Sequence, residues 1–261
     1  MPLLEAHNLR KTYAGRSVVS DVSFTVERAE VVGLLGRNGA GKTTSFRMTI
    51  GMIDPDPSSN NGTGNSRVIF DGKDVTRLPM YKRARLGMGY LSQEPSVFAR
   101  LTCEENLLAI LETLPISKSE RVSRAHSLLE QFSLLHKANH QARTCSGGER
   151  RKLEIARALV TQPRLILLDE PFSGVDPIAV EELQGEIRRL ADRGIAILIT
   201  DHNVHQTLRI VDRACIIVEG RKLAEGTPRQ LINDDTVKRA YLGGLFKGDE
   251  FDAPIQIGGA R

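Results

Sequence analysis

Short apolar runs alternate along this chain with longer segments of helical periodicity. The runs are rich in β-branched and leucine residues, are bounded by turn residues and cover residues 31–35, 165–168, 195–199 and 214–218. Such runs are typical of strands that are buried on both faces. Because helical segments lie between them, the pattern predicts an α/β fold with a mostly parallel sheet flanked by helices.

Ahead of the first buried run, the pattern changes to alternation. Residues 18–26 alternate apolar and polar positions, which is typical of an antiparallel strand with one buried face. We therefore expect a small antiparallel β-layer at the front of the fold.

Helical signals replace strand signals in the middle of the chain. Thr102 and Ser117 each stand three residues before a glutamate, which is the capping-box pattern of a helix start. Apolar residues follow at helical spacing: Leu107, Leu108 and Leu111 after the first start, and Val122, Ala125, Leu129 and Phe132 after the second. The pattern predicts a helical subdomain of about residues 95–160, inserted into the α/β core.

Two segments show no clear period. Residues 54–66 are rich in Pro, Ser, Asn and Gly, which predicts a mobile surface loop. Residues 248–261 predict a loose C-terminal tail. We expect the remaining residues, 1–247, to form one domain.

Composition limits the class of protein. The 36 Lys and Arg residues are interspersed with 32 Asp and Glu residues, so no nucleic-acid surface is predicted. Three widely spaced cysteines without a CxxC pair favour a reducing, cytoplasmic compartment. The N-terminus lacks a secretion signal, and no apolar run approaches the roughly 18 residues that span a bilayer. Any work at a membrane therefore requires other chains to supply the spanning part.

Candidate chemistry begins directly after the first buried run. The motif G-x-x-x-x-G-K-[ST] lies between a predicted strand and a helical segment, the context in which it binds phosphate through backbone N–H groups and a helix N-terminus. Lys42 can reach the β- and γ-phosphates, Thr43 offers a hydroxyl to Mg²⁺, and Thr44 offers another to phosphate. The predicted nucleotide-binding residues are Gly36, Arg37, Asn38, Gly39, Ala40, Gly41, Lys42, Thr43 and Thr44.

A pair of acids ends the buried run 165–168. Ligands of open α/β sheets lie beyond the carboxyl ends of the strands, which places Asp169 to hold a metal through its water shell and Glu170 to act as general base on an attacking water. Without the phosphate loop, two adjacent acids could equally form a solvated turn. Tyr13 lies in the predicted β-layer and could stack an adenine ring, although an isolated surface tyrosine usually has no such role. The chain lacks an Asn-Lys-x-Asp motif for guanine, which favours ATP over GTP.

A second anion site is predicted at the start of another helical segment. Ser146 is a plausible N-cap, and Gly147, Gly148 and Glu149 follow it. A helix start alone would be the simpler explanation. Together with the phosphate loop, the acids and Gln93 after the predicted strand 89–91, however, this order of motifs resembles the ATP-binding subunits of ABC transporters over essentially the whole chain.

The resemblance implies a homodimer that holds two ATP molecules with Mg²⁺. Each ATP is then bound between the phosphate loop of one copy and residues 146–149 of the other. The resemblance also implies that Gln93 senses Mg²⁺ and the attacking water, that His202 contacts the γ-phosphate, and that residues 173–176, ending in Asp176, cross the dimer seam. Asp176 before Pro177 is also an ordinary helix N-cap, and both roles can hold.

Longer stretches narrow the resemblance. Residues 93–101, 146–157, 171–178, 200–204 and 237–243 are similar to the lipopolysaccharide-export ATPases of Gram-negative bacteria, and branched-chain amino-acid importers share part of this pattern. The likeness implies transmembrane permease subunits as partners. It places their contact in a groove near Phe98 and Arg100, and the protein on the cytoplasmic face of the inner membrane.

Three residues depart from the family pattern. Arg37 stands where Pro or Ser is common, Cys145 replaces a leucine, and Ala29 occupies a turn position where Gly is expected. Two other classes stay open: a soluble ABC ATPase of DNA repair or translation, and an unrelated P-loop kinase or GTPase. The first usually carries two ATP-binding domains or a long coiled-coil insertion, and the second leaves residues 146–149 and Gln93 unexplained.

Overall fold

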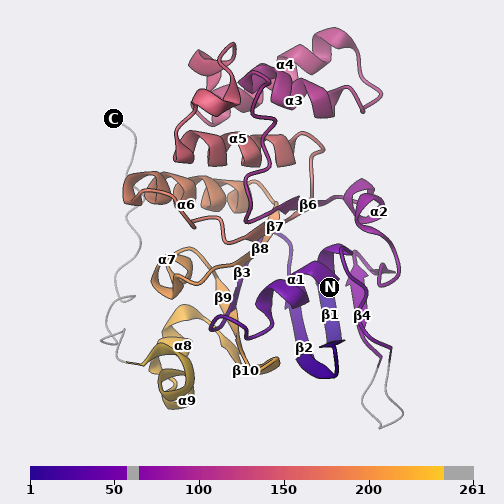
Figure 1. Cartoon of the computed structure of the whole chain (residues 1–261), viewed down its shortest axis with the longest axis vertical. Helices are drawn as coiled ribbons and strands as arrows, with labels where there is room; N and C mark the ends of the chain where they lie inside the picture. Colours follow the sequence, from indigo (N-terminus) through magenta and orange to yellow (C-terminus); the bar gives the residue numbers. More distant parts are fainter. Residues whose placement is uncertain (58–64, 244–261) are drawn as a thin grey trace.

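A ten-stranded sheet runs through the part of the chain that the computed structural model describes, residues 1–57 and 65–243 (Figure 1). The strand order is β5-β4-β1-β2-β10-β9-β3-β8-β7-β6. The strands are β1 (Leu4–Tyr13), β2 (Arg16–Val26), β3 (Val31–Leu35), β4 (Arg67–Phe70), β5 (Lys73–Asp74), β6 (Met88–Leu91), β7 (Leu165–Asp169), β8 (Ala196–Thr200), β9 (Arg213–Val218) and β10 (Arg221–Gly226). The helices are α1 (Lys42–Ile50), α2 (Met80–Arg85), α3 (Cys103–Leu111), α4 (Lys118–Gln131), α5 (Gly147–Leu159), α6 (Pro177–Asp192), α7 (Val204–Leu208), α8 (Pro228–Asn233) and α9 (Asp235–Val237), with short turns η1 (Leu135–Lys137), η2 (Ala142–Thr144) and η3 (Lys238–Leu242).

The parallel half of the sheet confirms the predicted α/β class. β3, β7 and β8 are buried along their whole length. β3 pairs in parallel with β8 and β9, and β7 pairs in parallel with β6 and β8. The predicted run 195–199 is displaced by one residue, because the N–H of Ile195 closes the turn after α6 by donating to the carbonyl oxygen of Leu190.

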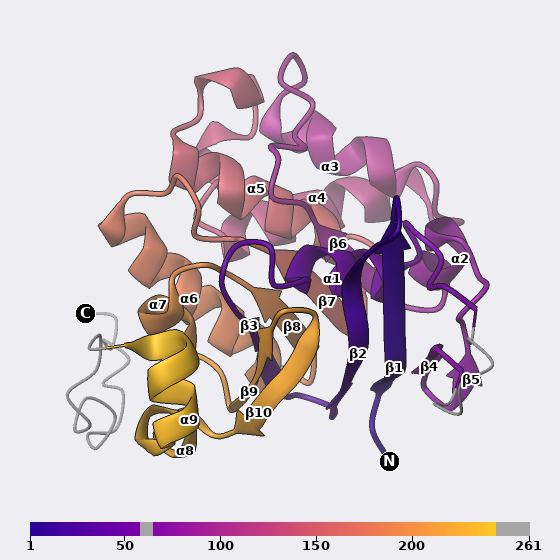
Figure 2. The same cartoon turned by 60° about the horizontal axis from the view of Figure 1, so that its bottom comes forward.

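The antiparallel layer lies where residues 18–26 predict it. β2 pairs antiparallel with β1, and β4 extends the layer on the other side of β1. The layer packs on α1 and so supports the helix that follows the phosphate loop (Figure 2). In the turn before β3, Ala29 adopts φ +58°, a left-handed conformation that only Gly adopts without strain, which accounts for the glycine expected there.

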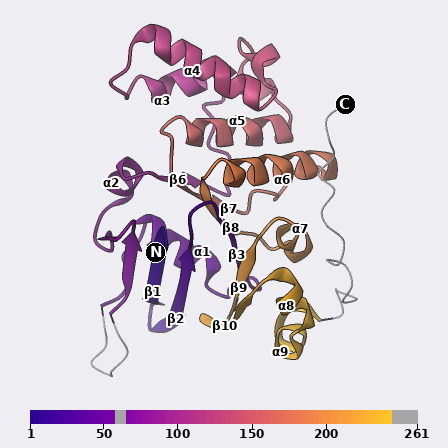
Figure 3. The ribbon, with the colours of Figure 1, turned by 180° about the vertical axis from the view of Figure 1, so that it is seen from behind.

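Helices α3, α4 and α5 pack together above α6 and the parallel strands (Figure 3). Thr102 and Glu105 form the predicted capping box at the start of α3. The second predicted box is only half right: Ser117 accepts a hydrogen bond from the N–H of Glu120, but the carboxylate of Glu120 pairs with Arg124 one turn later. An ion pair along the helix thus replaces the bond back to the helix start.

Two cysteines that are distant in sequence meet in this helical layer. The Sγ atoms of Cys103 and Cys145 are 3.6 Å apart, and both residues are free and buried. Burial raises the pKa of Cys103 to about 12, so the thiol form dominates. Cys145 is packed in the apolar core and serves as a small apolar residue at the position where the family pattern has leucine.

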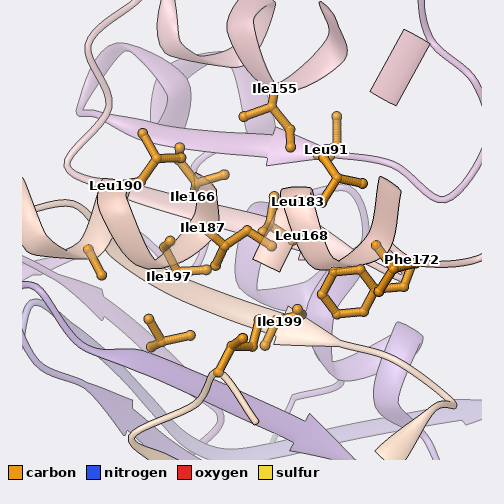
Figure 4. Close-up of a cluster of buried hydrophobic side chains, with 14 of the residues drawn as sticks. Leu91, Ile155, Ile166, Leu168, Phe172, Leu183, Ile187, Leu190, Ile197 and Ile199 are labelled. Carbon is orange, nitrogen blue, oxygen red and sulfur yellow. The ribbon is translucent and has the colours of Figure 1, made fainter. Parts of the chain in front are cut away.

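Apolar side chains of α6 pack on β7 and β8 and join the helical layer to the sheet (Figure 4). These side chains are Leu183, Ile187 and Leu190 from α6 and Ile166, Leu168, Ile197 and Ile199 from the strands. Since the carboxyl ends of β7 and β8 carry Asp169 and Thr200, this packing also fixes the edge of the sheet where the acids lie.

The remaining sequence predictions concern the membrane and the two segments without a period. None of the helices in residues 1–57 and 65–243 has the length and apolar character needed to cross a bilayer. Part of the predicted surface loop 54–66 and the whole predicted tail 248–261 lie outside the described residues.

Arg83, on α2, is fully buried and donates hydrogen bonds to the C-terminal end of α1. Its guanidinium donates to the carbonyl oxygens of Met48 and Thr49 at 2.9 and 2.6 Å, and to those of Thr76 and Leu78 at 2.9 and 2.7 Å. Burial lowers its pKa to about 10, and the side chain is protonated at neutral pH. One side chain thus ties the helix behind the phosphate loop to the β-layer.

We expect Arg83→Met to lower the free energy of unfolding by about 2–4 kcal/mol, because four carbonyl groups, three of them in buried bonds, would lose the guanidinium as donor. Urea denaturation checks this value. Lys82→Met, at an exposed position on the same helix, is the control and should change stability by less than about 0.5 kcal/mol. Equal stability of the two variants would show that the buried guanidinium is not needed.

Candidate nucleotide site

Two glycines fix the loop between β3 and α1. A Cβ at Gly36 would lie 2.3 Å from the carbonyl oxygen of Ile217, so no side chain fits there. Gly41 has φ +100°, and a Cβ on it would lie 2.8 Å from the carbonyl oxygen of Val18. The loop therefore turns tightly against β2 and β9 and ends at the N-terminus of α1.

Lys42 begins α1 and turns back over the loop. Its Nζ donates to the carbonyl oxygens of Gly36 and Arg37 at 2.7 and 3.1 Å. Burial lowers the pKa of Lys42, and the carboxylates of Glu170 and two aspartates oppose this shift. Because an ammonium group has three N–H donors, these two bonds orient the charge and leave one donor for an anion.

The buried acid of the site is Asp169, the last residue of β7. Its side chain is 2 % exposed and accepts a hydrogen bond of 2.7 Å from the hydroxyl of Thr200, its partner in the parallel register of β8. Burial raises the pKa of Asp169 and the hydrogen bond from Thr200 lowers it, with a net rise. Burial therefore disfavours the ionised form of this carboxylate, as at sites where a bound cation stabilises the charge.

Glu170 brings three loops together. It has φ +46°, a conformation that non-glycine residues rarely adopt, and its N–H donates to the carbonyl oxygen of Thr200 at 2.8 Å. Its carboxylate accepts a 2.7 Å bond from Nε2 of Gln93 and lies 3.3 Å from Nδ1 of His202. This backbone conformation therefore brings three of the predicted site residues into contact.

These groups open onto one pocket of about 500 Å³. Its lining residues are Val18, Asn38, Gly39, Ala40, Gly41, Lys42, Thr43, Thr44, Gln93, Glu170, Ser173 and His202. Phosphate-binding backbone, a lysine, hydroxyl groups and a carboxylate thus converge on one volume. This arrangement can bind a polyphosphate and present a base to it.

Other predicted site residues do not line this pocket: Tyr13, Gly36, Arg37, Asp169, Asp176, Ser146, Gly147, Gly148 and Glu149. The carbonyl oxygens of Gly36 and Arg37 accept hydrogen bonds from the ammonium of Lys42 and so orient it. Asp169 turns its carboxylate toward Thr200, at the sheet edge beside the pocket. Tyr13 ends β1 and is 47 % exposed.

Residues 146–149 and Asp176 form a separate corner at the starts of α5 and α6. Ser146 and Glu149 make a full capping box, and Glu149 also pairs with Lys137 at 2.7 Å, which holds the pKa of Glu149 below its usual range. Asp176 caps α6 by accepting the N–H of Ala179 at 3.0 Å. Both N-cap predictions are confirmed. This corner does not line the chain's own pocket.

Comparison with known proteins identifies the family. A family profile described as "ABC transporter" matches residues 19–173, more than half of the chain. The chain belongs to the ABC transporter ATP-binding family. A second profile, described as "Branched-chain amino acid ATP-binding cassette transporter", matches residues 221–247 of this ABC ATPase.

Individual relatives agree with the family assignment. The lipopolysaccharide export system ATP-binding protein LptB of Haemophilus influenzae is 49% identical over 95% of this chain and 100% of its own length. The protein of the same name from Escherichia coli K12 is 48% identical, with the same two coverages. A crystal structure of an ATP-binding cassette of an ABC transporter in its ADP conformation aligns with a TM-score of 0.82 at 27% identity, covering 93% of this chain and 99% of that one.

The fold and the activity of this ABC ATPase follow from that membership. It carries the P-loop, an antiparallel β-layer and helices on the parallel sheet, and it hydrolyses ATP to drive transport. Family membership excludes the interpretation of this chain as an unrelated P-loop kinase or GTPase.

Sequence reasoning missed Thr200 and Arg151, which support the acids. Thr200 donates a hydrogen bond to Asp169. In the sequence, a polar residue at the end of a buried strand is the feature that points to it. Arg151 is 6 % exposed and donates to the carbonyl oxygens of Ser92 and Asp169 and to Glu154. In the sequence, the feature that points to Arg151 is a pair of Arg and Glu three residues apart on the apolar face of α5. Arg151 thus joins the segment of Gln93 to the end of β7.

The raised pKa of Asp169 has a consequence for stability. A carboxyl whose pKa is raised by folding costs stability above that pKa, and the cost disappears as pH falls through it. We expect Asp169→Asn, without nucleotide or Mg²⁺ at pH 7, to raise the melting temperature by roughly 2–4 °C, the shift that about 1 kcal/mol produces in a chain of this size.

The gain should shrink toward pH 4 while ATPase activity is lost at every pH. Melting curves in EDTA across this pH range, beside a hydrolysis assay, check both statements. Glu27→Gln, at an exposed position in the turn between β2 and β3, is the control and should show no gain. A variant no more stable than the wild type at pH 7 would contradict the stability prediction.

Proposed function

We propose that this chain is the ATP-hydrolysing motor of a lipopolysaccharide exporter, working as a homodimer that closes around two Mg²⁺-ATP. The observation that carries the catalytic part is the convergence of Glu170, Gln93 and His202 on the phosphate-loop pocket. The substrate class is supported by relatives that bear the lipopolysaccharide-export name at 48–50% identity over nearly the whole chain.

For nucleotide binding, the proposal assigns the phosphates to the backbone of residues 36–44 and to Lys42. Mg²⁺ is a hard cation that prefers oxygen ligands and keeps part of its water shell. Thr43 and Gln93 line the pocket with oxygen donors, and the buried carboxylate of Asp169 lies at the same sheet edge, so the residues present fit this ion. When bound, Mg²⁺ neutralises charge on the phosphates.

For hydrolysis, the chain's own residues supply the proton chemistry. Glu170 accepts the proton of the attacking water, and the amide of Gln93 holds the carboxylate in place by its 2.7 Å bond. His202, beside the same carboxylate, donates to the γ-phosphate as charge develops. Tyr13 stacks the adenine ring at the end of β1.

ATPases of this family dimerise and work on transmembrane subunits. We assign the second phosphate contact to Ser146, Gly147, Gly148 and Glu149 of the opposite copy. A capped helix N-terminus that does not line its own chain's pocket supports this assignment. Asp176, which caps α6 beside that corner, is placed at the seam by the same argument.

The membrane partner docks on the groove near Phe98 and Arg100 in this proposal. Phe98 is 46 % exposed, the guanidinium of Arg157 lies 4.9 Å from its ring centroid, and Asn106 bonds to its backbone N–H at 2.8 Å. These contacts position the aromatic side chain while it stays partly exposed, as for aromatic residues at protein–protein contacts. The chain then lies on the cytoplasmic face of the inner membrane.

A branched-chain amino-acid importer is the second candidate, favoured by the profile that matches residues 221–247. Purification of the tagged chain from its own cell membranes, with mass spectrometry of the bound membrane subunits, separates the two. We expect lipopolysaccharide-export permeases, and lipopolysaccharide should accumulate in the inner membrane when the chain is depleted. Recovery of amino-acid permeases, with normal lipopolysaccharide transport after depletion, would reverse the assignment.

A further inference from the structure

The segment after α1 is fastened to the end of β1. The N–H of Asp56 donates to the carbonyl oxygen of Arg10 at 2.9 Å, and Nζ of Lys11 donates to the carbonyl oxygen of Asp54 at 2.7 Å. These bonds place residues 54–56 alongside residues 10–12. The contact joins the predicted loop to the strand that ends at Tyr13.

The side chain of Asp56 completes this contact with both carboxylate oxygens. One oxygen accepts the N–H of Thr12 at 2.6 Å, and the other lies 3.0 Å from Nζ of Lys11. The side chains of Asp56 and Lys11 are 28 % and 19 % exposed, so solvent screens the pair only in part. One carboxylate thus fixes both a backbone position and a charged side chain in the two residues before Tyr13.

Tyr13 is in contact with Lys11, one of the residues that Asp56 holds. Nζ of Lys11 lies 5.8 Å from the centroid of the Tyr13 ring, a cation–π distance. Tyr13 pairs with Arg16 at the turn into β2, and Val18 of β2 lines the nucleotide pocket. The hairpin that carries the ring is therefore continuous with the pocket wall, although the ring itself does not line the pocket.

We propose that Asp56 is a positioning residue for the nucleotide base. It holds Thr12 and Lys11 so that the half-exposed ring of Tyr13 is presented to adenine in one orientation. The inference rests on the proposed stacking of adenine on Tyr13. It gives a function to the part of the segment 54–66 that the structure describes.

The test compares ATP with inorganic tripolyphosphate, which offers phosphates without a base, as competitors of a fluorescent ATP analogue on the full chain with Mg²⁺. We expect Asp56→Ala to weaken ATP binding by roughly 3- to 10-fold and to leave tripolyphosphate binding unchanged, because only the stacking contribution is lost. Asp56→Asn, which keeps an acceptor for Thr12 but loses the charge facing Lys11, should fall between. In the Tyr13→Ala background, Asp56→Ala should have no further effect.

Asp71→Ala is the matched control, since Asp71 is also salt-bridged and its backbone N–H bonds to Leu3, just before the opposite end of β1. Equal weakening of ATP and tripolyphosphate by Asp56→Ala would reduce Asp56 to a structural residue and overturn the proposal. An effect of Tyr13→Ala on ATP without one of Asp56→Ala would overturn the role of Asp56 alone. No effect of Tyr13→Ala would overturn the stacking itself, and the inference with it.

Discussion

Glu170→Gln should reduce ATP hydrolysis by roughly 10²- to 10⁴-fold while ATP still binds, because an amide cannot accept the proton of the attacking water. The amide has the size of the carboxylate, and the left-handed backbone at residue 170 is held by the bond from its N–H to Thr200. The pocket should therefore keep its shape. We expect a dimer with trapped ATP to accumulate, measured by size-exclusion chromatography with Mg²⁺-ATP beside a phosphate-release assay.

The control for this variant is Glu181→Gln on the exposed surface of α6, which removes the same charge away from the pocket. It should hydrolyse ATP at the wild-type rate and remain monomer or dimer as the wild type does. Unimpaired turnover in Glu170→Gln would exclude Glu170 as the base. Lost turnover together with lost ATP binding would instead assign it a role in holding the site.

Lys42→Ala acts one step earlier and should weaken ATP binding itself by roughly 10- to 100-fold, the value of a charge-assisted hydrogen bond to phosphate. Lys42 is 5 % exposed, and its ammonium bonds to the phosphate loop. Its loss removes the positive charge that faces the phosphates. Equilibrium binding of a fluorescent ATP analogue measures the change, and hydrolysis at low ATP should fall in parallel.

Because Lys42 also bonds to the carbonyl oxygens of Gly36 and Arg37, its removal could loosen the loop. Thermal unfolding without nucleotide separates the two effects: a binding role predicts lost affinity with little change in melting temperature. Lys73→Ala, exposed on β5, should leave both measurements unchanged. Wild-type affinity in Lys42→Ala would remove the lysine from the phosphate site.

The two variants test different halves of one proposed cycle. ATP supplies the anion that the start of α5 in the opposite copy binds, so closure depends on nucleotide binding. Hydrolysis removes the γ-phosphate contact and lets the dimer open. Arg151 bonds to the carbonyl oxygens of Ser92, beside Gln93, and of Asp169, at the end of β7. In the proposed cycle these bonds, with Phe98 further along the chain, connect the pocket to the membrane partner.

The sequence by itself determined the features that depend on neighbouring residues. The phosphate loop, the buried strand before it and the N-caps at Thr102, Ser146 and Asp176 are read within a few positions, since loop sterics, burial on both faces and capping act locally. The same locality explains the partial error at Ser117, where a competing ion pair formed one turn away.

Only the tertiary structure decided which distant residues meet. Gln93, Glu170 and His202 lie in separate loops, and the parallel register of β7 with β8 is what aligns Asp169 with Thr200. The bonds of Arg83 to the end of α1 and of Asp56 to the end of β1 have no local signal, because Thr49 and Thr12, the partners there, lie 34 and 44 residues away in the sequence. Local patterns set each element, whereas the pairing of strands and the packing of loops between them set the site.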